Sequence, residues 1–248
     1  MRFTLQVWRQ AGPDAPGAFE SYQVDGLEPH LSILEMLDAL NERLIDEGRE
    51  PVAFESDCRE GVCGCCGLTV NGVAHGPEDN VPSCLQRLVD LPDGGTVRLE
   101  PLRSAAFPVV RDLVVERSSL DGLIRAGGYV SINAGTAPDA DSVPVKEEVA
   151  EKALDFAACI GCGACVAACP NGSAQLYAGA KLAHLAMLPL PSEERARRGR
   201  ALVAELDELF GPCSSYGECV RACPAGIPFS AIAAVNRERI LAGGRRRL

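Results

Sequence analysis

The sequence predicts an α+β fold in which a small domain of strands and one helix precedes a mostly helical domain. Three observations support this prediction. Short alternating strands with turn residues occupy residues 2–99, Ala-, Leu- and Glu-rich segments with helical spacing occupy residues 147–242, and cysteines recur in three spaced groups. A chain of 248 residues is long enough for two modest domains, which we place at 1–106 and 107–248.

The strands of the first domain are expected in two hairpins and one further strand. Residues 2–8 alternate apolar and polar side chains, a Pro/Gly-rich turn follows at 12–17, and a second strand lies near 22–24. An Asn-Gly turn within 68–73 predicts the second hairpin, and residues 96–99 supply the last strand.

One amphipathic helix is expected between these strands. Ser32 and Glu35 form a capping box at its start, apolar side chains then recur every three or four residues, and Gly48 can end it.

Helices are expected throughout the second domain, where clear strand alternation is absent. We place them near residues 147–158, 173–188, 194–210 and 228–242. The third of these carries four arginines, at positions 195, 197, 198 and 200. We interpret them as a solvated helix face, with contact to an anionic membrane surface or an acidic partner as the alternative.

The net charge of −10 is confined to the first domain. Residues 1–106 carry 8 basic and 18 acidic side chains, whereas residues 107–248 carry 16 of each. An acidic chain without interleaved basic and aromatic residues argues against a nucleic-acid partner.

No export signal or spanning segment is expected. The N-terminal stretch MRFTLQVWRQ lacks the basic-then-apolar layout of a secretory signal, and the longest apolar run, Leu182–Leu190, is too short to cross a bilayer. In a reducing compartment, clustered cysteines indicate metal or redox ligands rather than disulfides.

The first cysteine group has the spacing of a plant-type [2Fe–2S] ferredoxin. Cys58-x4-Cys63-x2-Cys66, completed by Cys84, supplies four thiolates, and the order of strands and helix around it is consistent with a β-grasp ferredoxin domain. Cys65 would give x4–x1 and falls outside the pattern. We interpret it as a small packed residue, with an alternative ligand role left open.

The second and third groups have the spacing of bacterial-type ferredoxin runs, the third with one cysteine missing. They read Cys159-x2-Cys162-x2-Cys165-x3-Cys169-Pro170 and Cys213-x5-Cys219-x3-Cys223-Pro224. In two-cluster ferredoxins the first three cysteines of a run bind one cluster and the fourth binds the other. This rule predicts a [4Fe–4S] cluster on Cys159, Cys162, Cys165 and Cys223.

Three cysteines then remain for the last cluster. Cys169, Cys213 and Cys219 suit a [3Fe–4S] cluster, because Tyr216 stands where the fourth thiolate would be. Structural zinc would need four ligands in tight pairs, and a Rieske centre would need paired histidines, neither of which the sequence provides. No nucleophile–base constellation, phosphate loop or dinucleotide fingerprint is visible. The sequence therefore predicts an electron carrier without an organic active site.

These motifs together resemble the iron–sulfur subunits of succinate dehydrogenase and fumarate reductase over essentially the whole chain. The resemblance rests on CREGVCGCCG at 58–67, Cys84, FPVVRDLVVER at 107–117, CIGCGACVAACPNGSA at 159–174 and CSSYGECVRACPAGI at 213–227. It implies an electron-transfer subunit of the tricarboxylic acid cycle and respiratory chain. Its partners would be an FAD-containing flavoprotein subunit that oxidises succinate to fumarate and membrane anchor subunits that bind quinone. The chain would then lie peripherally on the cytoplasmic face of the cell membrane.

Two differences from the family pattern bear on which quinone the complex would use. Ubiquinone-reducing relatives carry a tryptophan after the cysteine–proline that matches Cys169-Pro170 and a histidine after the cysteine that matches Cys213. Here residues 171–176 contain no tryptophan, and Ser214 replaces the histidine. Only Pro170 and Ser214 carry over, as neighbours of the quinone exit. The sequence resembles the menaquinone-linked, actinobacterial-type branch.

Two rival hypotheses are another oxidoreductase subunit and, from a different class, a free ferredoxin carrier. An iron–sulfur part of a heterodisulfide-reductase-like or glycolate-oxidase-like enzyme would carry two full four-iron runs and no plant-type loop. A free ferredoxin would be much shorter. Co-purification with a flavoprotein and a membrane partner separates these hypotheses.

Overall fold

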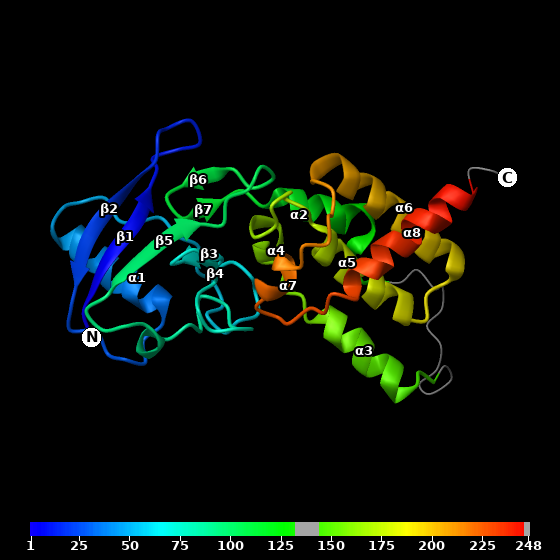
Figure 1. The fold of residues 1–248 in the computed structure, drawn as a ribbon, viewed down its shortest axis with the longest axis horizontal. Coiled ribbons are helices and arrows are strands. Elements are labelled where there is room, and N and C mark those ends of the chain that lie inside the picture. The colour runs from blue at the N-terminus through cyan, green and yellow to red at the C-terminus, as the bar shows by residue number, and fades with distance from the viewer. Residues whose placement is uncertain (132–143, 246–248) are drawn as a thin grey trace.

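The computed structural model describes residues 1–131 and 144–245. The strands gather at one end of an elongated molecule and most helices at the other, with short loops and helical turns between them (Figure 1). The mixture of strands and helices confirms the predicted α+β class.

The strand-rich end is a five-stranded mixed sheet with one long helix. Its elements are β1 (Phe3–Arg9), β2 (Ala18–Val24), α1 (Ile33–Asp46), β3 (Leu68–Val70), β4 (Val73–Ala74), a 3₁₀ turn (Leu88–Asp90) and β5 (Thr96–Pro101). The spatial order is β2-β1-β5-β3-β4, with β1 antiparallel to β2 and parallel to β5. Both predicted hairpins are confirmed.

Helix α1 begins with the predicted capping box. The Ser32 amide donates to Glu35 Oε2 at 2.7 Å, and the Glu35 amide donates to Ser32 Oγ at 3.3 Å. Two of the orphan amides of the first turn are thereby satisfied. The buried face of α1 packs with the inner residues of the sheet into one hydrophobic core, and Gly48 follows the helix at φ +69°.

A short hairpin that the sequence did not predict follows the sheet. It comprises β6 (Val109–Arg111) and β7 (Val114–Val115), which pair antiparallel. The buried Asp112 carboxylate accepts hydrogen bonds from the Arg9 guanidinium at 3.2 Å and the Ala53 amide at 2.9 Å, which ties the hairpin to the sheet. Phe107 belongs instead to the core of the helices. The hairpin is therefore fastened to both halves of the molecule.

The helical half is built around one central helix. Its elements are α2 (Ser118–Leu123), a π-helical turn (Ile124–Gly128), α3 (Glu147–Ala157), α4 (Ala164–Ala167), α5 (Gln175–Met187), α6 (Ser192–Leu209), α7 (Glu218–Arg221) and α8 (Ala231–Arg245). The four predicted helices are confirmed as α3, α5, α6 and α8. Helix α5 packs against the other three, and Gly179 lets it approach α8 closely: a Cβ there would lie 2.2 Å from the Ala231 carbonyl oxygen.

One of the four arginines on α6 is not solvated, which corrects the interpretation of that face. Arg198 has a side chain only 1% exposed. Its guanidinium donates to Glu194 at 2.7 Å, to the Tyr129 carbonyl at 2.8 Å and to the Ser131 carbonyl. Arg198 therefore holds the chain that follows the π-helical turn against α6.

Within residues 1–131 and 144–245, no helix is both long and apolar enough to span a bilayer.

Candidate iron–sulfur sites

The first three cysteines of the first group lie in a loop between α1 and β3, at the edge of the sheet that faces the helices, and Cys84 follows β4 (Figure 1). Backbone amides converge on one sulfur in the loop: the Glu60 and Cys63 amides donate to Cys58 Sγ at 3.4 and 3.3 Å. These donors lower the pKa of the Cys58 thiol to about 7. The loop thus stabilises a thiolate, which is the form that binds iron.

Cys66 and Cys84 lie on the buried side of this loop. Both belong to the hydrophobic core of the sheet, and their thiols are neighbours. Burial raises the pKa of the Cys66 thiol to about 12. A buried thiolate without a compensating cation is unfavourable, so this environment suits a sulfur that is bound to iron.

Cys65 lies beside Cys63, one of the four predicted ligands. Its amide donates to Cys63 Sγ at 3.5 Å. The donor atoms of Asp57, Cys63 and Cys65 all lie within 4.8 Å of one another. Spacing alone gave no reason to consider Asp57, because a carboxylate is not part of the plant-type cysteine pattern.

Four cysteines from both later runs line one pocket. They are Cys159, Cys162, Cys165 and Cys223. Glycines in the left-handed conformation stand on either side of Cys162, with Gly161 at φ +70° and Gly163 at φ +83°. Glycine adopts this conformation without strain and lets the backbone curve around a bound group.

Three cysteines line a second pocket together with Pro170, Ser214 and Tyr216. They are Cys169, Cys213 and Cys219. Asn171 orders the rim of this pocket, because its side-chain amide donates to Ser214 Oγ at 2.8 Å and to the Pro212 carbonyl at 2.9 Å. The Tyr216 side chain offers no thiolate and is largely exposed.

Leu176, at the start of α5, lines both pockets. The two sites are thus neighbours that share one apolar wall. Burial raises the pKa of the Cys162 thiol to about 12 and that of Cys165 well above its ordinary value. All twelve cysteines are free, so no disulfide competes for these thiols. Soft, buried and unpaired donors at these spacings fit iron–sulfur clusters.

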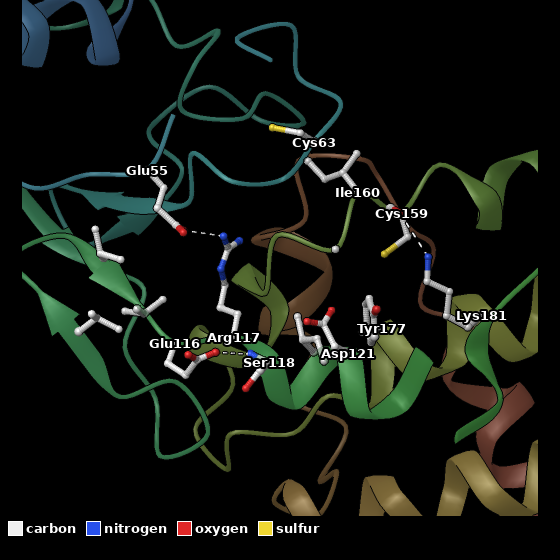
Figure 2. Close-up of a pocket in the computed structure, with 15 residues that line it drawn as sticks. Glu55, Cys63, Glu116, Arg117, Ser118, Asp121, Cys159, Ile160, Tyr177 and Lys181 are labelled. Atoms are coloured by element: carbon white, nitrogen blue, oxygen red, sulfur yellow. Dashed lines mark hydrogen bonds and ion pairs between the residues drawn. The ribbon is translucent and has the colours of Figure 1, made fainter. Parts of the chain in front are cut away.

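A polar cavity of about 520 Å³ lies between the first cysteine loop and the four-cysteine pocket. Figure 2 shows Cys63 and Cys159 on its wall, with Arg117 reaching up toward Glu55. Lys181 lines the same cavity, and its ammonium donates to the Cys159 carbonyl at 3.5 Å. Sequence reasoning missed Arg117 and Lys181, because neither belongs to a cysteine motif.

Two family models match the chain in the order that the cysteine groups predict. A 2Fe-2S iron–sulfur cluster binding domain matches residues 4–121, and a 4Fe-4S dicluster domain matches residues 158–227. The first match includes the β6–β7 hairpin.

Similarity to known proteins extends over nearly the whole chain. The fumarate reductase iron–sulfur subunit of Haemophilus influenzae is 33% identical over 83% of this chain and 84% of its own length. This chain belongs to the family of succinate dehydrogenase and fumarate reductase iron–sulfur subunits. The succinate dehydrogenase iron–sulfur subunit of Bacillus subtilis, a further relative, is 28% identical over 94% of this chain and 90% of its own length.

The fold of this family member is also found in a solved structure. A chain of the Mycobacterium smegmatis Sdh1 complex in the apo form superposes with a TM-score of 0.73 at 22% identity, covering 100% of this chain and 98% of the other. At that identity the likeness concerns the fold. The family resemblance stated from the motifs is confirmed by the sequence comparison, and the solved structure supports the fold.

Proposed function

We propose that this chain is the electron-transfer subunit of a succinate:quinone oxidoreductase. It would carry electrons between an FAD-containing flavoprotein subunit, which converts succinate to fumarate, and quinone bound by membrane anchor subunits. The single observation that supports this most is the grouping of the later cysteines into two adjacent pockets, of four and three thiols, to which both runs contribute.

The ligand sets of the two later clusters are proposed from the cysteines that line the two pockets. Cys58, Cys63, Cys66 and Cys84 would bind a [2Fe–2S] cluster, and the four-cysteine pocket a [4Fe–4S] cluster. Cys169, Cys213 and Cys219 would bind a [3Fe–4S] cluster, because Tyr216 supplies no fourth thiolate. When bound, these clusters supply one-electron transfer.

The chain itself tunes the sites in which the clusters would lie. Backbone amides donate to four of the proposed ligand sulfurs: to Cys58 and Cys63 as described, to Cys213 from Ser215 at 3.4 Å, and to Cys223 from Ile227 at 3.4 Å. Hydrogen bonds to sulfur and exclusion of solvent are the means by which a protein sets cluster potential. Leu176 excludes water from between the last two sites.

The location and the quinone extend the same proposal. The chain would lie peripherally on the cytoplasmic face of the membrane through its anchor subunits. Menaquinone is favoured because residues 171–176 contain no tryptophan and Ser214 replaces a histidine. Pro170 and Ser214, at the rim of the three-cysteine pocket, would be the residues nearest the quinone. We also propose that the division between the two domains lies between residues 106 and 107.

Electron paramagnetic resonance with a redox titration on the intact complex tests the three-iron assignment. Oxidised wild-type protein should give a three-iron signal, and Tyr216→Cys should abolish it and add about one iron per chain, because a fourth thiolate completes a cubane. Tyr216→Ser removes the ring without adding a thiol and should keep the signal. An oxidised wild-type complex with two four-iron clusters and no three-iron signal would contradict the assignment.

A further inference from the structure

One guanidinium joins the first cysteine loop to the loop of the four-cysteine pocket. Arg117 Nη1 donates to the Gly64 carbonyl at 2.6 Å and to the Cys162 carbonyl at 3.3 Å. Its Nη2 donates to Glu55 Oε2 at 2.6 Å, the ion pair drawn in Figure 2. Gly64 follows Cys63, and Cys162 is itself a proposed ligand. Arg117 therefore contacts the immediate surroundings of two cluster sites.

At Gly64 the backbones of the two loops approach each other closely. A Cβ on Gly64 would lie 2.3 Å from the Ile160 carbonyl oxygen and 3.0 Å from the Cys162 amide nitrogen. Gly64 also has φ +74°, a conformation that side chains disfavour. Because Gly64 has no side chain to act as a spacer, the distance between the two loops depends on the group that binds both backbones.

Arg117 is itself held in place. It follows the β6–β7 hairpin, which Asp112 ties to the sheet and Phe107 ties to the helices. Gly163 allows this, because a Cβ there would lie 2.7 Å from the Phe107 ring and 3.6 Å from Arg117 Cδ. The Arg117 side chain is 17% exposed, so solvent screens its hydrogen bonds only in part.

We propose that Arg117 is a positioning residue that fixes the distance and orientation between the [2Fe–2S] site and the [4Fe–4S] site. The proposal rests on the ligand sets given under the proposed function. The planar guanidinium presents several donors in a rigid fork and can reach two carbonyl groups and a carboxylate together. The proposal concerns this geometry rather than the positive charge alone.

Two substitutions separate geometry from charge. Arg117→Lys keeps the charge but offers one compact ammonium, which cannot span the three acceptors. Arg117→Gln removes both the positive charge and the planar, forked set of donors. Arg198→Lys is a matched control, because Arg198 likewise binds one carboxylate and two backbone carbonyls, yet it belongs to α6 and donates to Glu194, Tyr129 and Ser131 instead of to the cysteine loops. Glu55→Gln keeps Arg117 but removes the negative charge that binds its guanidinium. This variant replaces the Arg117 variants in the test if those assemble poorly.

The measurement is the magnetic interaction between the two reduced clusters in the purified complex, read from line broadening and power saturation of the [2Fe–2S] signal. This interaction depends steeply on separation and orientation. We expect it to be lost or heterogeneous in Arg117→Lys and Arg117→Gln, weakened in Glu55→Gln, and unchanged in Arg198→Lys. Hydrogen exchange should rise at the loops around Gly64 and Cys162 in the Arg117 variants.

Unchanged magnetic interaction and hydrogen exchange in Arg117→Gln would overturn the proposal. A change in Arg117→Gln that Arg117→Lys restores would also overturn it, because charge alone would then suffice. If the proposed function is wrong, the wild-type protein itself will lack the three cluster signals. This outcome is distinct from failure of the Arg117 proposal, which is judged only by comparing variants with wild type.

Discussion

The two halves of the molecule support their cysteines differently. In the strand-rich half, one continuous hydrophobic core spans β1, β2, β5 and α1, and the cysteine loop is attached to its edge. In the helical half, the apolar residues form separate clusters, and Cys159 and Cys165 pack against two of them. In the first half the core extends well beyond the two cysteines that join it, Cys66 and Cys84, whereas in the second half the cysteines lie among the apolar clusters themselves.

This difference shows where the stability of each half originates. A sheet with a covering helix can bury enough apolar surface to fold without metal. Helices whose central space is lined by thiols lose that burial when no cluster fills it, and buried thiols cannot ionise favourably without a cation. Iron should therefore matter much more to the helical half.

Removal of iron should give the largest effect on this comparison. After anaerobic chelation, amide hydrogen exchange should rise throughout α5 and α8, because these helices pack around the cysteine pockets. Protection in β1 and α1 should persist. Equal loss of protection in both halves, measured by mass spectrometry on the same sample, would contradict the comparison. Restoring iron and sulfide anaerobically serves as the control.

A smaller effect is expected from the buried guanidinium of the helical half. Arg198→Ala leaves two backbone carbonyls without their donor, removes one of the two guanidinium groups that bind Glu194, and should destabilise this half by about 3 kcal/mol. Arg197 pairs with the same Glu194, but its side chain is 57% exposed, so Arg197→Ala should change stability by less than about 0.5 kcal/mol. Thermal unfolding followed by circular dichroism measures both. Similar losses in the two variants would show that burial of Arg198 is unimportant.

The smallest effect concerns a buried histidine in the strand-rich half. Burial, with a smaller contribution from Arg117, lowers the pKa of His75 to about 4. The Ser83 amide donates to His75 Nδ1 at 3.2 Å, so the ring is held neutral. The unfolded state, with a pKa near 6.5, binds the proton first as pH falls. Stability is therefore full above about pH 6.5 and declines toward pH 4, by about 2 kcal/mol between pH 7 and pH 5.

Comparison with a variant isolates this contribution. His75→Gln should flatten the pH dependence of the unfolding midpoint of the strand-rich half, whereas His30→Gln, at an exposed position, should leave it unchanged. An identical pH profile in wild-type protein and His75→Gln would refute the assignment.

The sequence predicted what local signals encode. The capping box at Ser32 and Glu35, the Asn-Gly hairpin and the four long helices all depend on neighbours in the chain, and they are confirmed. The β6–β7 hairpin was missed because its strands are very short and its turn uses Asp112, at φ +45°, instead of a glycine.

The candidate sites likewise contain some features that the sequence predicted and others that it could not predict. Cysteine spacing grouped the thiols of the two later runs into the same sets that line the two pockets. Spacing could not reveal that Arg198 is buried or that Arg117 bridges two loops. Those roles depend on carbonyl groups that distant segments bring to each guanidinium, and such contacts leave no pattern along the chain.

The joint lining of one pocket by Cys159 and Cys223 has a consequence for synthesis on the ribosome. The first cysteine loop is complete once Cys84 has emerged, and the sheet needs only the residues up to Pro101. Once Cys165 has emerged, the four-cysteine pocket stays open until Cys223 follows, on the order of several seconds later at about 5–20 residues per second. Throughout that interval, three thiols of the nascent chain are accessible to oxygen and to foreign metals. Cells that make this protein in air therefore need to protect the helical half more than the sheet.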